Sequence, residues 1–177
     1  MLNESDIMGA VIKGKVWKFG DNIDTDVIIP GRYLTIRDPT QMASHAFEPI
    51  RPDLAKKITK GDIIVSGSNF GSGSSREEAP FVLKTLGIAA IVGQSFARIF
   101  YRNAINLGIP LLELKDSSKF FKEGDTVEIN SEEGTIKNVT QNKQYQGTKL
   151  PPFLMDIINA GGAVAAVKER IKLQKGQ

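Results

Sequence analysis

The sequence predicts an α/β domain whose sheet mixes parallel and antiparallel strands. Between residues 62 and 114, short apolar runs alternate with helix-like segments in the order strand, loop, helix, strand, helix, strand. This alternation implies parallel strands that are joined by right-handed helical crossovers. Two further strand patterns, GDTVEI at 124–129 and GTIKNV at 134–139, are joined by the turn sequence NSEEG and indicate an antiparallel hairpin.

The length of the chain, 177 residues, suits one domain. We expect a loose tail at 1–12 and a single domain at 13–177. Apolar residues make up 41% of the chain, but no apolar run is long enough to span a bilayer. The N-terminus also lacks the basic and apolar segments of a signal peptide, so we expect a cytoplasmic protein that has no membrane partner.

The elements on either side of the parallel core are short. IKGKVWKF at 12–19 partly alternates and indicates a strand; an aspartate-rich turn and the apolar run VIIP follow, and Pro30 ends that run. PTQMASHAFE at 39–48 indicates a short helix, and a Gly-Asp turn leads into a buried strand at 62–66. The segment at 150–173 indicates two helices that are separated by a Gly-Gly break.

Two amphipathic helices are expected within the parallel core. The first has apolar residues at i, i+3, i+4 and i+7, and Gly87 stands where a glycine ends a helix. These apolar positions are Ala79, Val82, Leu83 and Leu86. Ser95 is expected to cap the second helix, which ends near Gly108. The expected apolar face of this helix consists of Phe96, Ile99, Phe100 and Leu107. Strands at 88–92 and 109–114 follow the two helices.

The stretch NFGSGSSREEAP at 69–80 joins a strand to the first of these helices. Open α/β sheets bind ligands at such a point, where a helix N-terminus presents unpaired N–H groups and a partial positive charge. Gly71 and Gly73 let the backbone approach a ligand closely, and Arg76 offers a planar fork that suits a carboxylate. The loop therefore indicates a site for a small anion.

A purely structural interpretation of the same loop carries equal weight on these residues alone. Ser74 with Glu77, or Ser75 with Glu78, fits the S-x-x-E capping box of a helix start. Pro80 cannot donate to the helical hydrogen bonds, which favours a helix that begins late and leaves the preceding residues irregular.

Several other functions lack their sequence patterns. The loop lacks the third glycine of the dinucleotide fingerprint and the GK[ST] of a P-loop, and Asn69 stands where a nucleophile elbow needs serine. The chain contains no cysteine for a thiolate metal site, and His45, its single histidine, is the sole candidate base for a catalytic triad. The net charge of +3 comes from lysines spread along the chain, which suits small anionic substrates and does not indicate a nucleic-acid partner.

Four segments together carry a resemblance to a known family. They are KVWKFGDNIDTDVIIPGRYL at 15–34, NFGSGSSREEAP at 69–80, SFARIFYRNAINLGIPLL at 95–112 and PPFLMDIINAGG at 151–162. Most of residues 13–165 resembles the small subunits of the aconitase-type hydro-lyases, and most closely the isopropylmalate dehydratase group. The resemblance implies the swivelling β/β/α domain of the aconitase C-terminal type.

The resemblance also implies an activity and a partner. It implies a subunit of a hydro-lyase that interconverts 2-isopropylmalate and 3-isopropylmalate in leucine biosynthesis, by loss and return of water from a small dicarboxylate. It implies a cysteine-containing large subunit that carries a [4Fe–4S] cluster, without which the chain is inactive. No cofactor or metal is then expected in this chain, and a homo-oligomer of the isolated chain is left open.

Site residues carry over by their position in the shared motifs. Ser74 matches the serine that acts as the base, as an alkoxide, while Ser75 and Arg76 match residues that bind a substrate carboxylate. Asp26 matches an aspartate that lines the same site; the alternative is a turn aspartate that bonds its own backbone. Serine is a poor base in water, so it needs backbone N–H groups and a nearby cation to stabilise its oxyanion.

Four residues near the motifs have less definite roles. Ser72 and Glu78 flank the serine–arginine core and depart from the relatives, which often have cysteine and histidine there. Arg98 and Arg102 lie four residues apart on a helix, where a solvated face, a subunit contact and substrate binding all remain open.

GRYLTIRDP at 31–39 aligns with the loop that distinguishes members of the family. Relatives that act on a tricarboxylate are expected to carry arginine directly after Tyr-Leu, where this chain has Thr35 and Ile36. A third carboxylate would lack its partner, whereas a branched alkyl group could pack on Ile36, so isopropylmalate is favoured over homoaconitate or citrate. Arg37 lies close by and could bind a third carboxylate, so a tricarboxylate substrate remains an alternative. Dehydratases of methylmalate, citraconate or dimethylmalate are further alternatives. A swivel-domain module that binds or regulates without lyase chemistry is the alternative from another functional class.

Overall fold

The computed structural model of the chain describes residues 11–176. The tail that we expected at residues 1–12 lies outside this range up to residue 10, and the first strand already includes residue 12. No helix in the described part of the chain is long and apolar enough to cross a membrane.

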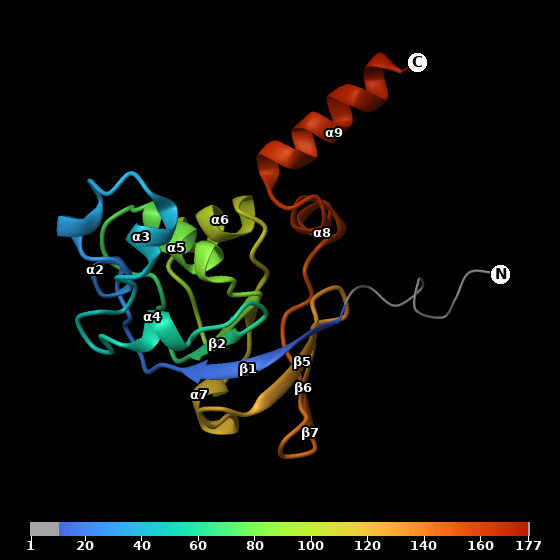
Figure 1. Cartoon of the computed structure of the whole chain (residues 1–177). Coiled ribbons are helices and arrows are strands. Elements are labelled where there is room, and N and C mark those ends of the chain that lie inside the picture. The colour runs from blue at the N-terminus through green and yellow to red at the C-terminus, as the bar shows by residue number, and fades with distance from the viewer. Residues whose placement is uncertain (1–10, 177) are drawn as a thin grey trace.

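The strands form one sheet with the order β4-β3-β2-β1-β5-β6-β7 (Figure 1). Their bounds are β1 Ile12–Lys18, β2 Ile63–Ser66, β3 Ala90–Gly93, β4 Leu111–Glu113, β5 Thr126–Asn130, β6 Thr135–Asn138 and β7 Lys143–Gln146. Strands β1 to β4 are mutually parallel, whereas β5 to β7 are antiparallel. The predicted parallel core and the predicted hairpin are both confirmed. The third antiparallel strand, β7, was not expected from the sequence.

Strand β1 joins the two parts of the sheet. Its second half pairs in parallel with β2, with Val16 opposite Ile63, while its first half pairs antiparallel with β5, with Ile12 opposite Ile129. The mixed sheet is therefore continuous, and the parallel strand ends are held in a fixed place relative to the hairpin.

Short helices connect the strands. Their bounds are α2 Thr25–Ile28, η1 Gly31–Tyr33, α3 Pro39–Ala43, α4 Leu54–Lys57, α5 Glu78–Leu86, α6 Arg98–Asn106, α7 Ser117–Phe120, α8 Pro152–Asn159 and α9 Ala163–Lys175. Helices α2 to α6 lie on one face of the parallel strands, and α7 lies on the other (Figure 1). Gly87 has a φ of +92° directly after α5, which confirms its predicted role at the helix end.

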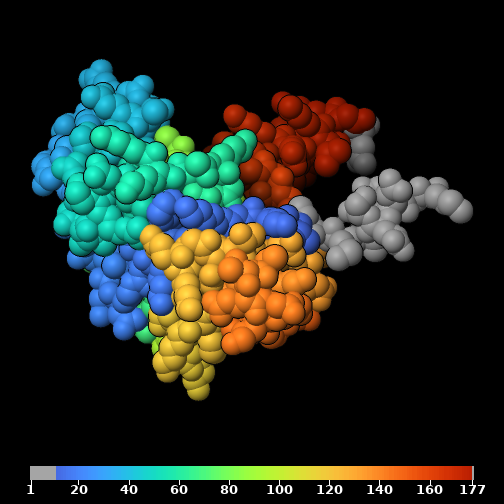
Figure 2. Space-filling view, turned by 60° about the horizontal axis from the view of Figure 1, so that its bottom comes forward, coloured from blue at the N-terminus to red at the C-terminus, as the bar shows by residue number. Residues whose placement is uncertain are grey.

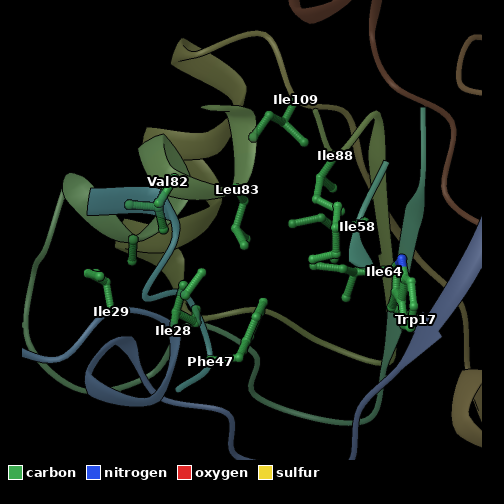
Figure 3. Close-up of a cluster of buried hydrophobic side chains, with 14 of the residues drawn as sticks. Trp17, Ile28, Ile29, Phe47, Ile58, Ile64, Val82, Leu83, Ile88 and Ile109 are labelled. Atoms are coloured by element: carbon green, nitrogen blue, oxygen red, sulfur yellow. The ribbon is translucent and has the colours of Figure 1, made fainter. Parts of the chain in front are cut away.

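Two hydrophobic cores fix the sheet between these layers. On β2, Ile64 faces the helices, whereas Ile63 and Val65 belong to the core on the opposite face, and all three are fully buried. Figure 3 shows the helix-side core, where side chains from α2 and α5 point toward those of the sheet. Each fully buried aliphatic side chain contributes about 1.5–3 kcal/mol, so these cores stabilise the strand ends that carry the loops.

The C-terminal segment is the least embedded part of the fold. Gly161 and Gly162 separate α8 from α9, as predicted, and neither helix contains a buried residue. Helix α9 extends away from the body, and Val164 on it is 70% exposed (Figure 1). Figure 2 shows the C-terminal helices at one edge of the molecule and the antiparallel strands on the side of β1 where β5 pairs with it.

The second amphipathic helix begins later than predicted. Helix α6 starts at Arg98, and its N-cap, Ala97, makes no side-chain cap. The Ser95 hydroxyl instead accepts a hydrogen bond from the backbone N–H of Asn69 at 2.8 Å, so the predicted cap is wrong. Ile99 is half exposed, not buried beside Phe100 on the predicted apolar face.

Candidate active site

The glycine-rich loop is fixed to the segment that follows β1. The N–H of Gly71 donates to the carbonyl of Ile23 at 2.7 Å, and the N–H of Thr25 donates to the carbonyl of Ser72 at 2.8 Å. Both segments leave the same edge of the parallel sheet, where α/β folds place their ligand sites. The glycine-rich loop and residues 23–25, which are far apart in the sequence, are thus joined by backbone hydrogen bonds.

Gly71 is required for packing as well as for backbone conformation. Its φ is +81°, and a Cβ atom there would lie 2.1 Å from the ring of Phe100. Gly73 has a φ of +92°, and a Cβ atom there would lie 3.4 Å from Asp24. The loop therefore has a backbone conformation that residues with a side chain rarely adopt, and α6 packs directly against it.

Neither capping box forms at the start of α5. The helix begins at Glu78, and its N-cap, Glu77, makes no side-chain hydrogen bond to the helix. Pro80 predicted a late start that leaves residues 74–79 irregular; the helix does start late, but residues 78 and 79 are already helical. The hydroxyls of Ser74 and Ser75 do not cap the helix and both residues are exposed, so the capping interpretation of the loop is wrong.

Arg76 is held in one orientation by three neighbours. Its Nη1 donates to Asp26 Oδ1 at 2.5 Å and to the carbonyl of Ile29 at 3.1 Å. A Cβ atom on Gly31 would lie 3.4 Å from Nη2, an ordinary van der Waals contact, so Gly31 borders the guanidinium. The Arg76 side chain is 19% exposed, so part of its planar fork remains open to a ligand.

Asp26 does not play the local turn role that was its alternative. Asp24 plays that role, because its Oδ1 accepts a hydrogen bond from the N–H of Val27 at 2.9 Å and caps α2. Asp26 instead faces Arg76, with its own side chain 62% exposed. The structure thus brings together two of the residues that the motifs indicated.

Thr25 is a member of the site that the sequence did not reveal. It is buried, and its hydroxyl donates to the carbonyl of Ser74 at 3.0 Å. The hydroxyl oxygens of Thr25 and Ser74 are 3.4 Å apart. Thr25 therefore fixes both the backbone and the hydroxyl of Ser74; its position between two aspartates in NIDTD was the one available signal.

A pocket of about 340 Å³ lies between the loop and the start of α6. Ser74 and Arg76 line it together with Arg98, whereas Arg102 lines a different pocket. The volume is within the range of small-molecule sites. The remaining residues of the wall are Thr25, Gly71, Gly73, Ala97, Ile99 and Phe100.

The other predicted substrate-binding residues do not line this pocket. Ser75 and Thr35 are exposed, and Ile36 packs against the helix-side core. The loop that carries Thr35 and Ile36 starts at Gly31, beside Arg76, so it lies next to the site without closing it.

The residues present do not fit an iron–sulfur cluster. The chain has no cysteine, and no group of three or more His, Asp or Glu side chains within residues 11–176 could hold a metal ion. The fixed serine, arginine and aspartate can bind an anion and move a proton, but any metal must come from elsewhere.

Comparisons with known proteins show the family of the chain. The model of the aconitase C-terminal domain family matches residues 13–117. The 3-isopropylmalate dehydratase small subunit of Wolinella succinogenes is 53% identical over 159 residues, covering 90% of this chain and 95% of that protein. The isopropylmalate/citramalate isomerase small subunit of Methanocaldococcus jannaschii is 51% identical over 164 residues, covering 93% and 98%.

A solved structure supports the same assignment. The crystal structure of 3-isopropylmalate dehydratase (leuD) from M. jannaschii superposes with a TM-score of 0.89 at 43% identity, covering 94% of this chain and 99% of that one. The agreement extends over nearly the whole length of both chains and confirms the predicted fold class. The chain therefore belongs to the aconitase C-terminal domain family, in the group of 3-isopropylmalate dehydratase small subunits.

Proposed function

We propose that this chain is the small subunit of a 3-isopropylmalate dehydratase, which interconverts 2-isopropylmalate and 3-isopropylmalate in leucine biosynthesis by removing and returning water. The observation that carries this proposal is the pocket that Ser74 and Arg76 both line. A hydroxy-diacid substrate needs a group that binds one of its carboxylates and a nearby group that accepts a proton. Such an enzyme works in the cytoplasm.

Arg76 binds one carboxylate of the substrate. Because its Nη1 is occupied by Asp26 and the Ile29 carbonyl, the remaining N–H groups of the guanidinium are oriented for the ligand. A guanidinium matches a carboxylate with two parallel hydrogen bonds, which fixes the position of the reacting carbons as well as the charge. Ser75, directly before Arg76, contributes its hydroxyl to the same carboxylate once the site is assembled.

Ser74 removes the proton from the carbon next to the one that bears the hydroxyl group. The positive charge of Arg76, which lines the same pocket, stabilises the oxyanion that this role needs, while the Thr25 hydroxyl holds the backbone carbonyl of Ser74. The same oxygen returns the proton when water adds in the opposite sense. Asp26 keeps Arg76 in place throughout.

The large subunit supplies what this chain lacks. The chain has no cysteine, so we place the [4Fe–4S] cluster of the family in a cysteine-containing partner. The pocket on this chain, lined by the loop and α6, then forms one wall of a site that the partner closes.

Reconstitution tests this function. Alone and without metal, the purified chain is expected to show no dehydratase activity, whereas mixing it with an anaerobically prepared large subunit should give turnover of 2-isopropylmalate. The matched control is the large subunit alone. Turnover by the isolated chain would exclude the proposal that activity requires the large subunit. A mixture that assembles but stays inactive would exclude 2-isopropylmalate as the substrate.

A second substrate is favoured by one comparison. The M. jannaschii relative, 51% identical, is an isopropylmalate/citramalate isomerase small subunit. Citramalate carries a methyl group where isopropylmalate carries a branched one, so the same carboxylate contacts could serve both. Relative kcat/KM values on the two alkylmalates will decide whether this chain accepts the smaller group.

The Thr35→Arg variant is expected to shift the preference of the reconstituted enzyme from isopropylmalate toward homoaconitate-type tricarboxylates. The added guanidinium would pair with a third carboxylate, and without one it would lie unpaired against an alkyl group. An alkyl contact in a pocket is worth roughly 1–3 kcal/mol, so the ratio of the two kcat/KM values should change by about 10- to 200-fold.

The comparison requires both substrates on both proteins with the same large subunit. Thr35 is exposed in the isolated chain, so an effect of this size would also show that the loop meets the substrate in the assembled enzyme. An unchanged ratio would remove residues 33–37 from substrate selection.

A further inference from the structure

Glu48 is the centre of a polar cluster outside the pocket, which we call the Glu48 clamp and define as Arg32, Tyr33, His45 and Glu48. One carboxylate oxygen accepts from Tyr33 Oη at 2.5 Å and from Arg32 Nη2 at 3.2 Å, and the other accepts from His45 Nδ1 at 2.6 Å. The rings of Tyr33 and His45 are stacked, with centroids 3.8 Å apart and planes 8° apart. Both oxygens of Glu48 are thus occupied by groups from two separate segments.

The backbone that carries Glu48 is fixed by the core. The preceding residue, Phe47, has a φ of +59°, which is unusual for a bulky side chain. Its N–H donates to the carbonyl of Ile28 at 3.0 Å, and its fully buried ring packs 4.4 Å from that of Phe19. Figure 3 shows Phe47 and Ile28 side by side at the base of the core. A strained residue held this firmly indicates that the position of Glu48 matters.

Residues 29–33 connect the clamp directly to Arg76. At one end, the carbonyl of Ile29 accepts from Arg76, and Gly31 borders the guanidinium. At the other end, Tyr33 and Arg32 bond to Glu48. The single turn of η1 lies between these ends, and the N–H of Tyr33 donates to the carbonyl of Pro30 at 3.0 Å. A displacement of Tyr33 would therefore disturb the turn that carries Gly31 and adjoins the Ile29 carbonyl, the two groups that border the arginine.

We propose that Glu48 is a positioning residue that, through Tyr33, Arg32 and His45, fixes residues 29–33 and thereby holds Arg76 in the orientation that binds the substrate carboxylate. This inference rests on the proposed function of Arg76. Glu48 acts as a carboxylate, since the hydrogen bond from Tyr33, followed by that from His45, lowers its pKa to about 2. The single histidine of the chain thus serves as a stacked donor and not as a catalyst.

The first test compares Glu48→Gln and Tyr33→Phe with the wild type in the reconstituted enzyme. Loss of the clamp should lower kcat/KM for isopropylmalate by roughly 10- to 100-fold, the scale of a small misplacement of a binding group. Glu128→Gln is the matched control, because Glu128 also pairs with a cation, Lys13, and is 31% exposed, against 30% for Glu48. It should change kcat/KM by no more than about twofold.

Epistasis with Arg76 separates positioning from general stability. In an Arg76→Lys background, Glu48→Gln should lower kcat/KM much less than in the wild type, because the planar guanidinium that Glu48 orients is already gone. An equal loss in both backgrounds would overturn the proposal. So would a lower melting temperature with kcat/KM unchanged, since that pattern belongs to a residue that only stabilises the fold.

Hydrogen exchange on the small subunit tests the clamp without any activity. Glu48→Gln should speed amide exchange at residues 31–36, while exchange in β2 stays as in the wild type. Unchanged exchange at 31–36 would overturn the proposal even if turnover falls. If instead the wild-type mixture shows no turnover, the proposed function fails, and the exchange result still decides whether Glu48 fixes the segment.

Discussion

The Ser74→Ala variant, assembled with the large subunit, is expected to lose roughly 10²- to 10⁴-fold in kcat, the usual contribution of a positioned base. Ser74 is exposed, and its hydroxyl lies near that of Thr25 at 3.4 Å, so the folded chain loses little when the oxygen is removed. Assembly with the partner and KM should therefore remain close to those of the wild type. Steady-state kinetics with purified complex will separate these quantities.

Two neighbouring variants make the result specific. Ser75→Ala is expected to raise KM with a smaller effect on kcat, because Ser75 is proposed to bind the substrate carboxylate and does not carry the proton. Thr25→Val removes the hydroxyl that holds the Ser74 carbonyl at 3.0 Å, so it should lower kcat without removing the base. If Ser74→Ala kept near-normal kcat, the proton acceptor would have to be sought in the large subunit.

The parallel core could be predicted because its signals are local. Helix α5 buries Ala79, Val82 and Leu83 as the 3.6-residue period requires, and Gly87 ends it in the left-handed conformation. The later strand β7 was missed because its KQYQ sequence is polar and mostly exposed, as befits an edge strand. Helices α2, α4 and α7 have four residues each, which is too short for a periodic pattern.

Other errors came from tertiary contacts that override local preference. Ser95 is a favourable cap by type, but the loop at Asn69 takes its hydroxyl as an acceptor. Asp24 and Asp26 lie two residues apart in one turn, and only the structure shows which of them caps a helix and which meets Arg76. Sequence motifs thus singled out Ser74 and Arg76, which line one pocket, whereas the contacts that support these two residues could be seen only in the fold.

The last of the large effects concerns Arg76. The Arg76→Ala variant is expected to lower kcat/KM for isopropylmalate by about 30- to 4,000-fold, since truncating one partner of a hydrogen-bonded charge pair costs roughly 2–5 kcal/mol. Arg76→Lys should restore only part of this loss. One ammonium cannot hold Asp26 and the Ile29 carbonyl while it also offers two parallel hydrogen bonds to the substrate.

A substitution of Asp26 and the addition of guanidinium ion test the role of Arg76 further. Asp26→Asn keeps the shape of the side chain but removes the charge that holds Arg76 Nη1 at 2.5 Å, so its loss should be smaller than that of Arg76→Ala. Guanidinium ion added to Arg76→Ala should recover part of kcat/KM, because the pocket then accommodates the missing group. If Arg76→Ala and wild type bound the diacid equally well, the carboxylate would be held by the large subunit, and the clamp at Glu48 would have no ligand group to orient.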